Sequence, residues 1–209
     1  MSKSNKEPNA TKKSLSKGLT VTVAQYVEFM EEFKEESDRA AVILGAAKLD
    51  LLLYQILIKI LVPNVGSNDE LFDGESPLST FSAKIHLCYR MGLIDSALTR
   101  SLHLIRKIRN NFAHEVTGCK LDSGSHRDRV KILVTPFKKI DKFKEGMKTI
   151  FGDKTNPSVD FRMALAWIVL GLEILLANTE PLELKPERLI PLRFLHSKSK
   201  KSPKEDISS

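Results

Sequence analysis

The sequence LIRKIRNNFAH, residues 104–114, places a polar and an apolar surface on one predicted helix. An α-helix turns about 100° per residue, so residues three or four apart share a face. The apolar face, with its flanking turns, carries Leu98, Leu102, Ile105, Ile108, Phe112 and Val116. The opposite face carries His103, Lys107, Asn110 and His114. This pattern predicts an amphipathic helix that packs on a hydrophobic core.

Arg109 projects at the edge of the apolar face of this helix, next to Leu98 and Val116. Its guanidinium cannot lose its charge, so a half-buried position there requires a partner. Asp50 is a lone carboxylate among leucines on another apolar segment and needs a partner equally. We therefore predict an Asp50–Arg109 ion pair, with Asp38 as the substitute acceptor. The other interpretation is that Arg109 binds a phosphate or a partner molecule.

Helical spacing and capping residues predict further helices on both sides of this segment. They cover Thr22–Glu36, Asp38–Leu61, a short helix from Ser79 or Thr80 to Gly92, Phe137–Phe151 and Pro157–Asn178, while Asp95 caps the helix that contains residues 104–114. The apolar run from Arg129 to Thr135 is short enough to be a strand or a helix. We predict an all-α fold, with a single-domain bundle of about six to eight helices over residues 21–195.

The stretch from Ala41 to Val62 is long and apolar enough to suggest a membrane span. Lys48, Asp50 and Lys59 interrupt it, and a bilayer would penalise these charges heavily. The sequence therefore predicts a central core helix that other elements surround, and no membrane attachment.

Basic residues give the chain a net charge of +7, which raises the question of nucleic-acid binding. Residues 1–20 hold five lysines and one glutamate, and residues 196–209 hold four lysines and two acids, so the body keeps a net charge of only +1. We expect both tails to be disordered and solvated. The first twenty residues contain no apolar signal segment, and cysteine is rare, so a cytoplasmic location is expected.

No motif for a cofactor or a metal is visible in the sequence. Glycine-rich phosphate loops and nucleophile motifs are absent, and the histidines and cysteines lack the paired spacing of zinc sites. Residues 79–114 have the outline of a helix-turn-helix. However, the second helix is long, amphipathic throughout and part of a nearly neutral body, which favours a bundle hairpin over a DNA-reading unit.

Three sequence blocks resemble the bacterial mannitol operon repressor family. They are SDRAAVILGAAKLD at residues 37–50, PLSTFSAKIHLCYRMGLI at residues 77–94 and LHLIRKIRNNFAH at residues 102–114. The resemblance implies an all-helical regulator of a mannitol or sugar-alcohol utilisation operon. That family lacks a recognised DNA-binding motif, so the resemblance also implies a protein partner, such as another transcription factor. The basic stretch Lys138–Lys148 departs from the family and leaves an ancillary nucleic-acid contact open.

The residues from Arg109 to His114 also resemble the Arg-x4-His motif of HEPN domains, many of which are metal-independent ribonucleases. The resemblance implies that His114 would move a proton near a 2′-hydroxyl, that Arg109 would hold the phosphate, and that Asn110 would help orient it. Arg109 and His114 lie about 140° apart on one straight helix, so two subunits of a homodimer would have to complete such a site.

The sequence thus predicts a regulator that acts through protein–protein interaction and is not an enzyme. We expect the partner-binding residues to be Arg106, Arg109, Asn110 and His114. Their supporting residues are expected to be Asp38, Arg39 and Asp50. The alternative function is RNA cleavage by Arg109 and His114.

Overall fold

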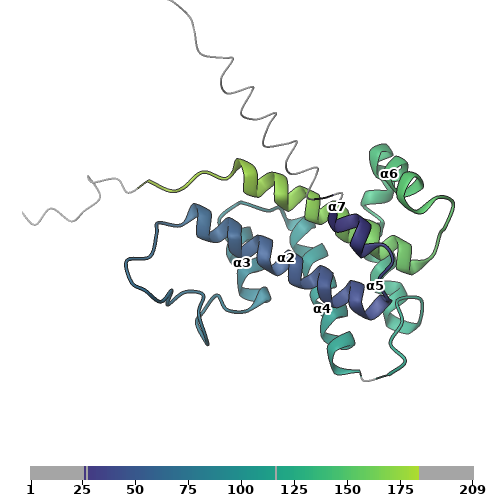
Figure 1. The fold of residues 1–209 in the computed structure, drawn as a ribbon, viewed down its shortest axis with the longest axis horizontal. Helices are drawn as coiled ribbons and strands as arrows, with labels where there is room; N and C mark the ends of the chain where they lie inside the picture. The colour runs from purple at the N-terminus through teal and green to yellow at the C-terminus, as the bar shows by residue number, and fades with distance from the viewer. Residues whose placement is uncertain (1–25, 27, 116, 184–209) are drawn as a thin grey trace, which may run out of the picture.

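The computed structural model describes residues 26, 28–115 and 117–183, and these residues form helices and loops without a strand (Figure 1). The helices are α2 (Asp38–Ile60), α3 (Phe81–Arg90), α4 (Ser96–His114), α5 (Gly124–Val134), the 3-10 helix η1 (Phe137–Lys139), α6 (Asp141–Phe151) and α7 (Pro157–Asn178). The all-α prediction is therefore confirmed. The predicted tails, residues 1–20 and 196–209, lie outside the described residues. Of the first predicted helix, residues 22–25 and 27 also lie outside them, and residues 28–33 are helical.

Helices α2 and α7 lie side by side and run in the same direction (Figure 1). Gly45 of α2 permits this close packing, because a Cβ atom there would stand 2.3 Å from Cδ1 of Leu165. Lys48 of α2 pairs with the buried Glu173 of α7 at 2.9 Å. Lys59 donates to the Leu176 carbonyl at 2.7 Å and so satisfies the C-terminal end of α7.

Helix α2 is long and apolar enough to cross a membrane, with a mean hydropathy of 1.8, but half of that apolar window is buried inside the bundle. Lys48 and Lys59, the two lysines in this apolar segment, both contact α7. The prediction that other elements surround α2 is wrong for one line of residues. Leu44, Leu51 and Ile58, which repeat every seven positions, are 41–51% exposed, because α3, α4 and α7 cover only the remaining sides.

Helices α3 and α4 form the predicted hairpin, and both begin at the predicted capping residues. Thr80 accepts from the Ala83 N–H at the start of α3, and Asp95 accepts from the Leu98 N–H at 2.7 Å at the start of α4. The turn between them passes through Gly92 with φ +73°, a conformation that favours glycine. The apolar face of α4 buries Leu102, Ile105, Ile108 and Phe112, whereas the predicted member Val116 lies outside the described residues.

Two predicted boundaries are corrected in the second half of the chain. The segment that the sequence left between strand and helix is helical, and α5 begins at Gly124, five residues earlier than the apolar run suggests. The single helix predicted over Phe137–Phe151 is two pieces, because Ile140 adopts an extended conformation between η1 and α6.

Candidate functional site

Arg109 projects from α4 at an intermediate depth, and the predicted ion pair with Asp50 does not form. In the described residues, its guanidinium makes one hydrogen bond, from Nη1 to Oδ1 of the adjacent Asn110 at 3.2 Å, and no ion pair. Asp50 pairs instead with the buried Lys84 of α3 at 2.9 Å. Helix α3 packs against α2, and this packing places Lys84 beside the Asp50 carboxylate. Arg109 is therefore available to an acidic group outside the described residues.

The substitute acceptor, Asp38, is also engaged elsewhere. Its Oδ1 accepts from Ser158 and, at 3.1 Å, from Nη1 of Arg162, and its Oδ2 accepts from the Leu121 N–H at 3.1 Å. Arg162 is only 6% exposed and also donates to the Glu36 carbonyl. Burial would raise the pKa of Asp38, but these hydrogen bonds and the Arg162 charge hold that pKa below its ordinary value. Asp38 thus joins α2 to α7 and does not contact Arg109.

Arg39, the neighbour of Asp38, supports the C-terminal end of α4. Its two terminal nitrogens donate to the carbonyls of Phe112 and Glu115, each at 2.5 Å. The last carbonyls of a helix lack intrahelical partners and carry partial negative charge, so a guanidinium there satisfies both requirements. The first turn of α2 therefore fixes the helix end that carries His114.

The remaining residues predicted for the site lie on the surface of α4. His114 is exposed and is the last residue of the helix, and Asn110 is half-buried. Arg106 is half-buried, and its Nε lacks a hydrogen-bond partner within the described part of the chain. Asn111, with its amide oriented to satisfy its neighbours, accepts from Nη1 of Arg129 on α5 at 2.9 Å. These contacts do not bring Arg109 and His114 together.

A groove of about 350 Å³ runs between the first half of α4 and the end of α5. Its walls carry Arg100, His103 and Lys107 as basic or titratable groups, and Ala97, Ser101, Leu104, Ile132 and Pro136 as small or apolar ones. No acidic side chain is among these residues. Ile132 is 61% exposed although it is apolar. Burial, the His86 ring and the charges of Arg106 and Lys107 lower the pKa of His103, and its Nδ1 has no hydrogen-bond partner in the described residues.

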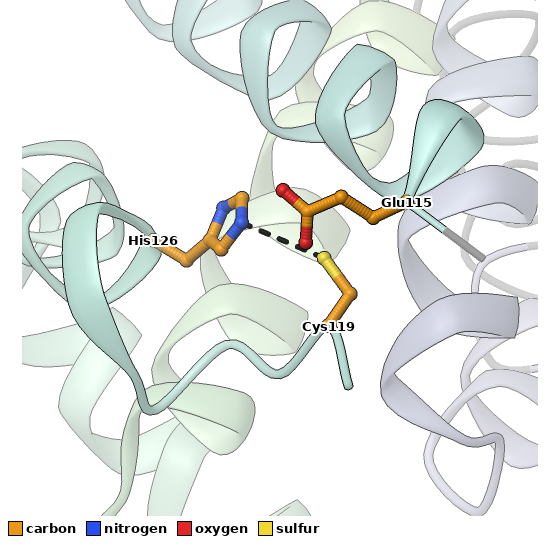
Figure 2. A group of neighbouring side chains, drawn as sticks. All are labelled: Glu115, Cys119 and His126. Atoms are coloured by element: carbon orange, nitrogen blue, oxygen red, sulfur yellow. Dashed lines mark hydrogen bonds between the residues drawn. The ribbon is translucent and has the colours of Figure 1, made fainter. Parts of the chain in front are cut away.

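The end of α4 also carries a cluster of three potential metal ligands, shown in Figure 2: Glu115, Cys119 and His126. Sγ of Cys119 lies 3.5 Å from Nε2 of His126, and the three ligand atoms lie within 4.8 Å of one another. His126 is buried, in the first turn of α5, and Phe112 packs edge-on against its ring. Burial, together with the adjacent Glu115 carboxylate, raises the pKa of the Cys119 thiol to about 11.

Cys119 and His126 were not predicted as ligands, because their spacing differs from that of the paired ligands in zinc fingers. Their signal is a glutamate, a cysteine and a histidine with gaps of three and six residues, placed where one amphipathic helix ends and the next begins. Lys84 and Arg162, the partners of the two acids of α2, were not predicted either.

Comparisons with known proteins return no match: no protein-family model, no curated protein and no solved structure matches this chain. The resemblance of three sequence blocks to mannitol operon repressors accordingly stays a prediction, and so does the HEPN-like motif.

Proposed function

We propose that this protein is a non-enzymatic regulator that binds an acidic, partly apolar segment of a partner protein along the polar face of α4. The observation that carries the proposal is the groove between α4 and α5, whose lining combines basic and apolar residues and contains no acidic side chain. Arg100, His103 and Lys107 line it, and Asn110 and His114 continue the same face of the helix.

The charge of this surface favours an anionic partner. In the part of the chain that the structure describes, Arg100, Lys107 and Arg109 form no ion pair, so each can meet a carboxylate without breaking an existing contact. The positive neighbours that lower the pKa of His103 would be offset by acidic groups. Complementary charge steers encounter and sets specificity more than it adds affinity.

The apolar part of the surface favours a protein over a nucleic acid. An apolar anchor in a pocket supplies much of the affinity of a peptide complex, and Leu104, Ile132 and Pro136 offer such a pocket. Single-stranded nucleic acids instead bind on aromatic rings that stack with bases, and the groove offers no aromatic ring besides the imidazole of His103. From Arg100 to His114 the face is about 21 Å long, enough for a partner helix of about four turns.

The regulatory part of the proposal has a separate support, the resemblance of residues 37–50, 77–94 and 102–114 to mannitol operon repressors. On this basis the partner is a cytoplasmic protein, such as another transcription factor, and the outcome of binding is a change in expression of a sugar-alcohol operon.

The proposal is tested by photo-crosslinking in cells grown on mannitol. A photoreactive phenylalanine analogue at Ile132 of the full-length chain should capture a defined partner, and the crosslinked peptide of that partner should be acidic. The double variant Arg100→Glu, Lys107→Glu should lose the crosslink and alter transcript levels of the mannitol operon.

The matched control is Lys142→Glu, which reverses an exposed charge on α6, away from the groove. It should retain both the crosslink and the transcript level. Equal capture by the parent and by the Arg100→Glu, Lys107→Glu variant would exclude the groove as the binding surface.

A second candidate function is RNA cleavage, which the absence of an ion pair at Arg109 within the described residues favours. An exposed His114 one and a half turns away could act with Arg109 of a second subunit. Purified protein incubated with total RNA tests this function. Cleavage that disappears in both His114→Ala and Arg109→Met would replace the regulator proposal by an enzyme.

A further inference from the structure

Three chemically different metal ligands converge where α4 ends and α5 begins. Glu115 is the residue that caps α4, Cys119 belongs to the following loop, and His126 lies in the first turn of α5. Figure 2 shows the three side chains pointing toward one another from these separate segments. None of them belongs to the groove proposed above for a protein partner.

The separation of Cys119 and His126 matches the separation that zinc imposes on a sulfur and a nitrogen ligand. Zinc binds a cysteine sulfur at about 2.3 Å and a histidine nitrogen at about 2.0 Å in tetrahedral geometry, which sets the two atoms about 3.5 Å apart. The observed separation of Cys119 Sγ from His126 Nε2 is 3.5 Å. The Glu115 carboxylate lies within 4.8 Å of both atoms, close enough to share an ion with them.

A hydrogen-bonded cluster without a metal satisfies these groups poorly. His126 is only 7% exposed, so water has little access to its ring. Its Nε2 faces the Cys119 thiol, which is a weak hydrogen-bonding group. The Glu115 carboxylate lies beside the same thiol, within 4.8 Å of it. A divalent cation would bind the carboxylate, the sulfur and the imidazole together.

The donor set selects the class of ion. A cysteine sulfur disfavours Mg²⁺ and Ca²⁺, which take oxygen ligands, whereas one sulfur, one imidazole and one carboxylate suit Zn²⁺. Three protein ligands leave the fourth tetrahedral position for water or for a group from another molecule.

We propose that Glu115, Cys119 and His126 bind one Zn²⁺ ion. The bound ion ties the C-terminal end of α4 to the first turn of α5 and so fixes the segment between them, beside the exposed His114. This site is independent of the proposed partner groove, and the two proposals can fail separately.

Metal titration of the full-length protein without an affinity tag tests the site. Zn²⁺, added in competition with a chromophoric chelator, should bind at one equivalent. Co²⁺ in its place should give the near-ultraviolet charge-transfer band of a cobalt–thiolate bond and the strong visible bands of tetrahedral coordination. Cys119→Ser should abolish the charge-transfer band, and Cys119→Ser and His126→Ala should each weaken Zn²⁺ binding by at least about 100-fold.

Cys88→Ala and His86→Ala are the controls, because they remove the other described cysteine and a histidine that is exposed on α3. Both should keep the parent's affinity and spectrum. Glu115→Gln changes an exposed residue, so it keeps the test valid if His126→Ala does not fold, and it should weaken Zn²⁺ binding measurably. Zn²⁺ affinity equal in the parent and in Cys119→Ser, or bound Co²⁺ without the charge-transfer band, would overturn the proposal.

Discussion

At the interface of α2 with α7, buried charges meet charges of the opposite sign, whereas on α4 comparable groups meet none in the described part of the chain. Arg162 reaches Asp38, and Lys48 reaches Glu173. On α4, neither Arg106 nor Arg109 forms an ion pair with a described residue, and the one hydrogen bond of the Arg109 guanidinium there goes to the amide of its neighbour. Buried charges that are paired hold two helices together, whereas a half-buried charge without an acidic partner requires another explanation. We infer from this difference that the ion pairs of α2 and α7 stabilise the fold, and that the unpaired charges of α4 serve binding to other molecules.

The largest expected effect is at Arg162. Arg162→Met leaves the partly buried carboxylate of Asp38 without its cation, which should lower the free energy of unfolding by about 3 kcal/mol. Urea denaturation followed by circular dichroism measures the change. A loss below about 1 kcal/mol would remove the distinction between the two regions.

Acid should act on the same interface. Because the folded state holds the pKa of Asp38 below its ordinary value of 3.8, the ionised carboxylate contributes stability that is fully present above pH 3.8. That contribution is lost as the pH falls through the lower folded pKa. Urea midpoints between pH 5 and pH 2 should therefore fall less steeply for Asp38→Asn than for the parent. Parallel curves for the two proteins would contradict the assignment.

The same substitution of arginine by methionine can be made at Arg109 on α4. Arg109→Met should alter the free energy of unfolding by less than about 0.5 kcal/mol, because no ion pair to a described residue is lost and the apolar stem is replaced. The measurement is the one used for Arg162→Met. Equal losses for the two variants would mean that Arg109 has a structural partner.

The smallest expected effect concerns His103. Two-dimensional NMR titration should give His103 a pKa below 6.5, and Lys107→Gln should raise it, because one nearby positive charge is removed. Burial and the charges of His86 and Arg106 persist in this variant, so the pKa should stay below 6.5. An unchanged His103 pKa would show that Lys107 does not shape the field of the groove.

Helices with strong signals were predictable from the sequence, and contacts between helices were not. Apolar spacing and capping residues located α2, α3, α4 and α7 to within a few residues, since those signals are local. The extended conformation of Ile140 was missed, because helical spacing continues across it. The prediction of Arg109 as the partner of Asp50 was wrong. A helical wheel gives the direction of a side chain, but not whether Arg109 or Lys84 lies opposite it.

The candidate sites show the same limit. The polar face of α4 was visible in the sequence, but the groove also needs Ile132 and Pro136, which lie beyond a loop and another helix. The cluster of Glu115, Cys119 and His126 spans a helix end and a loop, where no periodic pattern guides prediction.

The first turn of α2 has a consequence for how the protein is made. Asp38 and Arg39 are adjacent, yet their partners Arg162 and Phe112 lie 124 and 73 residues further along the chain. During translation the ribosome must release almost all of α4 before Arg39 finds its acceptors, and the beginning of α7 before Asp38 is neutralised. Such distant closures are slow compared with local helix formation. The first turn of α2 therefore lacks its final contacts until α7 has been synthesised. A truncation before residue 158 would leave Asp38 without its Ser158 and Arg162 partners.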